Sequence, residues 1–231
     1  MLEIIAESVS DALAAEAGGA TQLELISDIF EDGLTPSAGL IEQACANVHI
    51  PVLVMVRPHA RTFVYSPDDV AVMCADIRTA CDLGASGLML GCLTPDGRMD
   101  HSAIRSFQEA ARGHPLHCHN AWQLTANPEQ ALEEIISLGF LSVRITGGRS
   151  VGGKATENMP RIRQFAQQGA GRIEFLLAGG VHAGNVAQLV ASTGVRNVHA
   201  GAGARIPPQR GGVVDAGKVA GLAEALRQAS R

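Results

Sequence analysis

The sequence predicts an α/β protein built as a (β/α)8 barrel, and two observations carry this prediction. Short apolar runs recur about every 25 to 30 residues, and there are eight of them. Between the runs, apolar residues follow one another at spacings of three and four, which is typical of helices. Strands that alternate with helices pair in parallel through right-handed crossovers, and eight such units close into a barrel of roughly 250 residues. With 231 residues and no Pro-rich or charged linker, the chain fits a single-domain TIM barrel over residues 1–231.

Each apolar run is a predicted strand. In chain order the runs are 2–6 (LEIIA), 22–26 (QLELI), 52–56 (VLVMV), 87–91 (GLMLG), 116–120 (LHCHN), 142–146 (SVRIT), 174–178 (EFLLA) and 197–201 (NVHAG). The helical spacing is clearest in 68–83, 128–138 and 215–228, where Gly or Pro stands near the ends. Active sites of such barrels lie at the C-terminal ends of the strands, so the residues just after each run are candidates for chemistry.

Composition and charge exclude several classes of partner. The net charge is -5 and the basic residues are scattered, so we expect neither a nucleic acid nor a membrane as partner. No signal-like start and no apolar run near 18 residues is present, which predicts a cytoplasmic protein. The cysteines are odd in number and lack CxxC spacing, so we expect reduced thiols. They are Cys45, Cys74, Cys81, Cys92 and Cys118.

Polar side chains interrupt strands whose inward positions are normally aliphatic. Burying one unpaired charge is very costly, so acids, a guanidinium and imidazoles directed at one barrel mouth must neutralise one another or a ligand. Such proximity also shifts proton affinities, which prepares groups for acid or base catalysis. The candidate catalytic residues are Glu3, Glu24, Arg57, His119 and His199.

Two other interpretations of these residues stay open. Glu24 and Arg57 could form a buried ion pair that only braces adjacent strands, and Glu3 could face outward. His117 and His119 form an HxH pair whose imidazoles share one face of a strand, as metal ligands require. No Asp or Glu follows in that run, so the sequence leaves open whether any metal binds.

Glycine-rich segments follow the last three predicted strands. Glycine lets backbone amides approach an anion, and the loops after strands seven and eight commonly hold phosphate in such barrels. Turns after strands are also often rich in glycine without binding anything. The candidate ligand-binding residues, with two arginines as charge-assisted donors, are Gly147, Gly148, Arg149, Gly179, Gly180, Gly201, Gly203 and Arg205. The Pro- and Gly-containing segment 203–215 is predicted to be a mobile flap over the site.

Several segments resemble those of the CutC family. They are LEII with ESVSDALAAEAGGATQLELI at the start, DGLTPSAG (32–39), VRPHARTFVYS (56–66), GLMLGCLTPDGRMD (87–100), HCHNAWQLTANP (117–128), and LAGGVHAGNV with GVRNVHAGAG (177–203). The resemblance implies a cytoplasmic barrel that forms homo-oligomers, with copper binding proposed for some members and no reaction firmly attached. It also implies that Glu3, Glu24, Arg57, His119 and His199 are the shared polar residues.

The chain departs from the family pattern at the positions that matter most for copper. Ile5 and Ala6 stand where the family often has a pair of cysteines, and Ile26 replaces the Cys after the second-strand Glu. Copper(I) prefers thiolate and thioether ligands, so the obvious copper site is missing. Asn120 and Gln123 stand where the family motif carries Arg and Asp, which lowers the charge of the mouth.

Three functions follow from these observations. The first is a copper-homeostasis protein that binds or influences Cu(I), as the resemblance implies. The second is an enzyme of the isomerase or lyase type, in which Glu24 or His119 moves a proton while Arg57 stabilises an oxyanion and the glycine loops hold a small anionic or hydroxylated substrate. The third is a ligand sensor or assembly partner. The residues favour the second as chemistry, although a barrel alone cannot choose among reactions.

Overall fold

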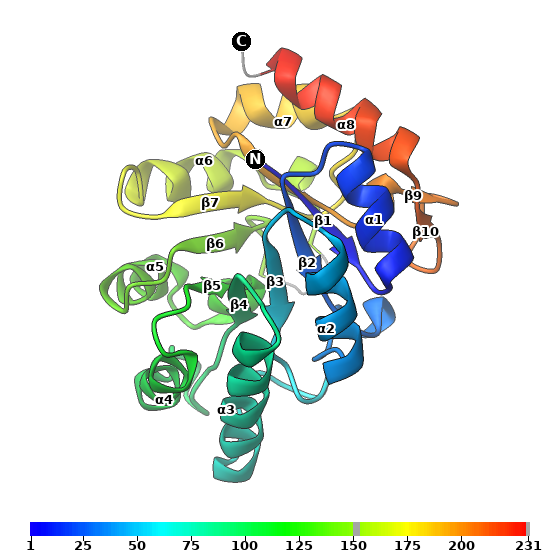
Figure 1. The fold of residues 1–231 in the computed structure, drawn as a ribbon. Helices are drawn as coiled ribbons and strands as arrows, with labels where there is room; N and C mark the ends of the chain where they lie inside the picture. The colour runs from blue at the N-terminus through cyan, green and yellow to red at the C-terminus, as the bar shows by residue number, and fades with distance from the viewer. Residues whose placement is uncertain (150–152, 230–231) are drawn as a thin grey trace.

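The computed structural model describes residues 1–149 and 153–229, and it confirms the (β/α)8 barrel (Figure 1). Eight parallel strands close on one another, because β8 pairs with β1. The strands are β1 Leu2–Ala6, β2 Gln22–Leu25, β3 Val52–Met55, β4 Gly87–Leu90, β5 Leu116–Cys118, β6 Ser142–Ile145, β7 Glu174–Leu177 and β8 Asn197–Ala200. Each predicted strand is found, and most end one or two residues earlier than predicted because the chain turns there into the loops of the mouth.

The helices lie outside the barrel; α1 to α7 connect successive strands, and α8 follows the last one (Figure 1). They are α1 Val9–Ala17, α2 Ala38–Asn47, α3 Pro67–Asp82, α4 His101–Ala111, α5 Pro128–Ser137, α6 Met159–Gln168, α7 Val186–Thr193 and α8 Ala216–Ala229. Short 3-10 turns interrupt the loops at η1 Ile29–Glu31, η2 Asn120–Leu124, η3 Ala155–Glu157 and η4 Ala202–Ala204. The start of α3 shows why its sequence is helical there: Ser66 and Asp69 form a reciprocal capping box, and Pro67 occupies the first turn.

Alternation along the strands divides the apolar residues into two groups. In β1 and β2, neighbouring side chains point to opposite faces of the sheet. Ile4 and Leu23 pack outward in the main core against the helices, whereas Glu3 and Glu24 are buried on the inner face. Inside the barrel a much smaller apolar cluster remains, formed by Ile26, Ile29, Leu53, Met55 and Met89 with Ile5 against it. The outer core stabilises the fold, and the interior is left for polar groups.

A short antiparallel hairpin, β9 Arg205–Ile206 and β10 Val213–Val214, follows β8 and lies beside α1 (Figure 1). The Arg205 side chain is buried and donates to the carbonyls of Ile5 (3.1 Å) and Gly212 (2.8 Å). It also pairs with Asp11 at 3.3 Å, and Asp11 accepts from the Val214 amide at 2.9 Å. Two expectations need correction. Arg205 does not bind an anion, because its guanidinium is used to hold the hairpin together. The expected flap is anchored at its base, because the hairpin is bound to α1 through Asp11.

No described helix combines the length and apolarity that crossing a membrane would require.

Candidate functional site

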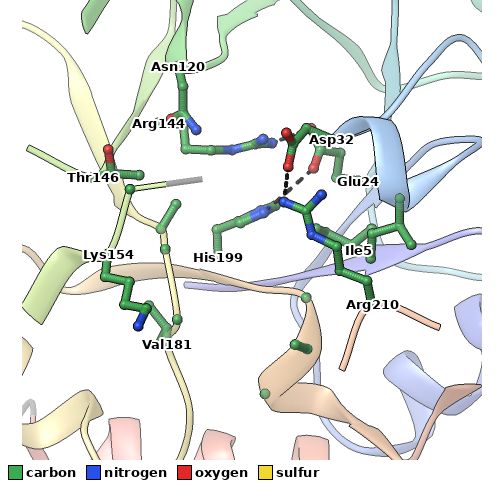
Figure 2. Close-up of a pocket in the computed structure, with 18 of the residues that line it drawn as sticks. Ile5, Glu24, Asp32, Asn120, Arg144, Thr146, Lys154, Val181, His199 and Arg210 are labelled. Carbon is green, nitrogen blue, oxygen red and sulfur yellow. Dashed lines mark hydrogen bonds and ion pairs between the residues drawn. The ribbon is translucent and has the colours of Figure 1, made fainter. Parts of the chain in front are cut away.

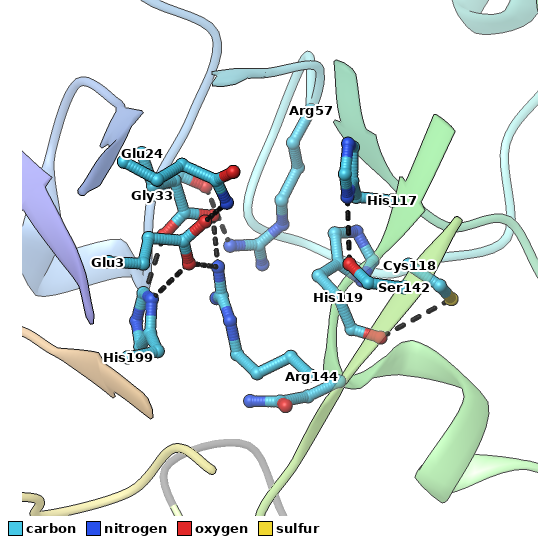
Figure 3. Close-up of polar contacts among 12 residues, drawn as sticks. Glu3, Glu24, Gly33, Arg57, His117, Cys118, His119, Ser142, Arg144 and His199 are labelled. Carbon is cyan, nitrogen blue, oxygen red and sulfur yellow. Dashed lines mark hydrogen bonds and ion pairs between the residues drawn. The ribbon is translucent and has the colours of Figure 1, made fainter. Parts of the chain in front are cut away.

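Four charged or titratable side chains from four strands meet inside the barrel (Figure 3). Nδ1 of His199 lies 2.6 Å from Oε1 of Glu3, and Nε2 of the same ring lies 3.7 Å from Oε2 of Glu24. Nη2 of Arg144 donates to Glu24 and lies 4.0 Å from Oε1 of Glu3. Gln22 donates to the second oxygen of Glu3 at 2.6 Å. We call Glu3, Glu24, Arg144 and His199 the interior cluster.

The barrel register explains why these groups meet. Glu3 stands opposite Gln22 of β2 on one side and opposite His199 of β8 on the other. Glu24 follows Gln22 by two residues and therefore faces the same way, and Arg144 reaches the pair from β6 across the interior. All four members of the interior cluster are buried, none more than 6% exposed. Carboxylates and cations at this depth must compensate one another, as expected from the sequence.

The charge state of Glu3 follows from its surroundings. Burial is the largest single effect and raises its pKa. The hydrogen bond from His199, the charges of His199 and Arg144 and the hydrogen bond from Gln22 together outweigh burial and lower the pKa to about 2. Glu3 is therefore a carboxylate at neutral pH and can only accept hydrogen bonds. Because Nδ1 of His199 points at this carboxylate, Nδ1 carries the proton, and Nε2 is directed towards Glu24.

A cavity of about 280 Å³ opens above the interior cluster (Figure 2). Glu24, Arg144 and His199 form part of its wall, and Lys154 and Arg210 add two further cationic side chains. The described residues that line the cavity also include Asp32, Asn120, Thr146, Ile5, Ile26, Ile29, Gly153, Ala178, Gly179, Gly180, Val181, Gly201, Ala202 and Gly203. The site therefore combines proton-transfer groups with cationic and glycine-rich walls.

Four of the predicted glycines lie where the anion hypothesis placed them: Gly179, Gly180, Gly201 and Gly203 all line the cavity. Gly179 and Gly180 have φ angles of 89° and 75°, which only glycine adopts without strain. A Cβ on Gly203 would lie 2.1 Å from the Val181 carbonyl oxygen, so the loops after β7 and β8 touch through backbone atoms. The other glycine pair lies elsewhere. The Gly147 amide donates to Gln123 at 2.8 Å, the Gly148 amide to Thr146 at 3.4 Å, and neither lines the cavity.

The arginines predicted from sequence occupy other places. Arg149 donates to the Thr125 carbonyl at 2.8 Å and does not line the cavity. Arg57 donates to the carbonyls of Glu31, Gly33 (3.1 Å) and Ala60 (3.3 Å). The alternative in which Glu24 and Arg57 only brace adjacent strands as an ion pair is therefore wrong, and Arg144 is the partner of Glu24.

Sequence reasoning missed Arg144 although the signal was present. Arg144 stands at the centre of the strand 142–146, in the same parity as Ser142 and Thr146. A cation inside a buried strand is as costly as the acid at Glu24, so it belonged among the candidates for the same reason. Lys154 and Arg210 lie in loops, where no periodicity marks them.

His117 and His119 each use Nδ1 for a hydrogen bond within the protein. Nδ1 of His119 accepts from the Ala121 amide at 3.2 Å, and Nδ1 of His117 lies 2.7 Å from the Ser142 hydroxyl oxygen. Among the residues with described positions, Glu3, Glu24 and His199 are the single group of three or more ligands with metal-ligand spacing, and there Arg144 already pairs with the carboxylates. Burial lowers the pKa of His119 to about 3, with the charges of Arg144 and Arg57 adding to it, so this imidazole is neutral at physiological pH.

The thiols lie away from the cavity. The described cysteines are free, and none of them is among the residues that line the cavity wall. Burial raises the pKa of both Cys92 and Cys118 to about 12, which keeps these sulfurs protonated and poor as metal ligands. The thiolate set that copper(I) prefers is therefore not assembled at this mouth.

Known proteins resemble this chain over most of its length. A family model described as CutC family matches residues 1–204. A family protein CutC from Xylella fastidiosa (strain Temecula1) is 38% identical over 209 residues, covering 90% of this chain and 77% of that protein. A copper homeostasis protein cutC homolog from Mus musculus is 38% identical over 202 residues, covering 87% of this chain and 73% of that protein. The crystal structure of a CutC protein from Streptococcus agalactiae has a TM-score of 0.82 and 31% identity, covering 87% of this chain and 97% of that one.

The two buried histidines predict how stability depends on pH. Burial lowers the pKa of His117 and His119 in the folded protein, so the unfolded chain binds more protons once the pH falls below about 6.5. The stabilisation is complete above the unfolded pKa and is lost as the pH falls toward the folded pKa. For each such imidazole the slope approaches about 1.4 kcal/mol per pH unit. We expect His119→Asn, which keeps an acceptor for the Ala121 amide, to make the fall between pH 6.5 and 5 shallower.

Urea unfolding at several pH values measures this slope, and His101→Asn on the exposed side of α4 is the matched control. An unchanged slope in His119→Asn would show that His119 is protonated in the folded protein.

Proposed function

The chain belongs to the CutC family, and we propose that it is an enzyme that moves a proton on a small anionic substrate at the mouth of its barrel. The observation that carries this proposal is the hydrogen bond of 2.6 Å between Glu3 and His199, with Glu24 and the cavity on the far side of the imidazole. An imidazole oriented by a buried carboxylate is the usual arrangement of a general base.

Each member of the interior cluster has a distinct part in this proposal. Glu3 does not line the cavity. It acts as a positioning residue, because its hydrogen bond to Nδ1 fixes the tautomer of His199. His199 lines the cavity, and its Nε2 is the atom that accepts a proton from the substrate. Glu24, 3.7 Å from Nε2, is the second group that can exchange that proton, and Arg144 holds its carboxylate in place. The reaction class supported best is proton abstraction next to a carbonyl, as in isomerases and some lyases.

The cavity walls support an anionic substrate. Lys154, Arg210 and Arg144 line the cavity, and so do the loops at Gly179–Gly180 and Gly201–Gly203, whose glycines let an anion approach the backbone amides. Arg144 is paired with Glu24 and Arg210 with Asp32, whereas Lys154 lies 3.8 Å from the exposed Glu157. A cavity of about 280 Å³ is at the lower end of the size of ligand pockets, so the ligand is a small metabolite rather than a dinucleotide.

Solvent deuterium exchange tests the proton transfer even while the substrate is unidentified. The protein is incubated in D2O with small molecules extracted from cells, and mass spectrometry follows deuterium uptake into carbon-bound positions. We expect the wild type to label a small carbonyl compound, and His199→Gln and Glu24→Gln each to slow the labelling by about 100-fold or more. His101→Gln, an imidazole on α4 outside the barrel, is the matched control and should label at the wild-type rate. Equal labelling by wild type and His199→Gln, or none by the wild type, would refute the proposal.

Copper binding is the function that the names of the relatives suggest, and the donor set does not fit it. The described cavity wall offers carboxylates, one imidazole and cations, but no thiolate or thioether. Cations beside the interior cluster also repel Cu(I). We expect an anaerobic Cu(I) titration to show only micromolar or weaker binding, with the same result after the thiols are alkylated. A tight site that alkylation removes would establish copper binding through cysteine instead.

A further inference from the structure

A second, smaller cavity lies next to the large one. It measures about 20 Å³ and shares Asp32, Asn120 and Arg144 with the large cavity. Its remaining walls are Met55, Arg57, Phe63 and His119. A space of this size accommodates roughly one water-sized group, so a single oxygen atom of a ligand fits it.

His119, which lines this small cavity, carries a buried hydrogen-bond donor without a partner among the described residues. Its Nδ1 accepts from the Ala121 amide, which leaves the proton of the neutral ring on Nε2. That Nε2 is buried, and the described residues provide no acceptor for it. The residue itself is only 4% exposed, so bulk water does not satisfy the donor. A buried donor without a partner costs free energy that a ligand acceptor would recover.

Two guanidinium groups complete the donor set. Arg57 is 5% exposed, donates to three carbonyl oxygens and also interacts with the Tyr65 side chain, and no carboxylate in the described part of the chain lies within ion-pair distance of it. Nε of Arg57 and Nε of Arg144 are both buried without an acceptor among the described residues. Within the described ranges, the residues that line the small cavity therefore carry three N–H donors without an acceptor, and Arg57 has no carboxylate partner. Asp32, the carboxylate in this wall, is already paired with Arg210. This donor set favours a negatively charged acceptor.

Phe63 closes this space on its apolar side. Its ring centroid lies 4.8 Å from that of His119 and 4.9 Å from the Arg57 guanidinium carbon. The aromatic ring holds both donors in place and lowers the local dielectric, which strengthens a hydrogen bond to a developing negative charge.

We propose that His119, Arg57 and Arg144 form an oxyanion subsite, which binds a carbonyl or carboxylate oxygen of the substrate in the small cavity. The substrate class is then a carbonyl or carboxylate compound with a second anionic group for the loops at Gly179–Gly180 and Gly201–Gly203. His119 acts as a neutral donor and not as the base that the sequence suggested, and Arg57 stabilises the oxyanion from outside the interior cluster. A neutral imidazole in this role is a known solution for polarising a carbonyl.

The chemical step rests on the proposed function and begins at the imidazole of His199. Nε2 of His199 takes the proton from the carbon next to the carbonyl. The electron pair of that C–H bond forms a carbon–carbon double bond, and the negative charge moves onto the carbonyl oxygen. The three N–H donors stabilise this oxygen until a proton returns to carbon and restores the carbonyl.

Binding of two simple anions tests the subsite apart from catalysis. Formate is the probe for the small cavity and inorganic phosphate for the glycine loops, and NMR of protein labelled with 15N-histidine follows both titrations. We expect formate to shift the Nε2–H signal of His119. We also expect His119→Asn, which keeps the acceptor for Ala121 but lacks Nε2–H, to weaken formate binding at least about tenfold while phosphate binding is unchanged. Arg57→Lys should have the same effect on formate, and Lys154→Ala should weaken phosphate alone. In the variants, the remaining histidine signals report the binding.

The outcomes separate the two proposals. Failure of formate to bind the wild type would mean that only water occupies the small cavity, and the subsite would be refuted. Equal formate binding by wild type, His119→Asn and Arg57→Lys would refute it as well, and Arg57→Lys decides alone if His119→Asn does not fold. Formate binding that follows the prediction, in a protein that exchanges no deuterium into any metabolite, would support the subsite and refute the proposed enzyme.

Discussion

The neutralisation of two buried carboxylates, Glu3 and Glu24, inside a closed barrel is the constraint on which the rest of the structure depends. A carboxylate in this interior needs a cation or several donors, because its desolvation costs several kcal/mol. His199 and Gln22 satisfy Glu3, and Arg144 satisfies Glu24. Plain hydrophobic packing would stabilise a barrel at least as well, so a polar interior of this kind is better explained by a function than by stability.

The polar interior is possible because the outer face of the sheet carries most of the apolar packing. The large apolar core lies between strands and helices, and the apolar group within the barrel is small. Stability therefore comes mainly from the outside of the barrel, and the inside can carry charge, a cavity and unsatisfied donors. Arg205 is another buried charge with a partner: at the C-terminal hairpin its guanidinium connects β9 and β10 to Asp11 of α1.

The sequence predicted the fold and the centre of the site because both depend on alternation along strands. Glu3, Glu24, Arg57, His119 and His199 were all expected to converge. Glu3, Glu24 and His199 do, whereas Arg57 and His119 line the neighbouring small cavity. Arg144 obeyed the same alternation and was overlooked. Arg57 follows the end of β3, and its partners are carbonyls of loops whose path no local pattern encodes. Whether His119 is a base or a donor depends on a single backbone amide, at Ala121, that only the folded chain brings to its ring.

The protonation state of His199 is the most direct measurement of the central claim. In NMR spectra of protein labelled with 15N-histidine, the signal that disappears in His199→Gln belongs to this ring. The hydrogen bond to Glu3 predicts a proton on Nδ1 that exchanges slowly with water near neutral pH, and Glu3→Gln should remove that protection. A His199 ring protonated on Nε2 alone, or an Nδ1 proton that Glu3→Gln leaves unchanged, would contradict the account.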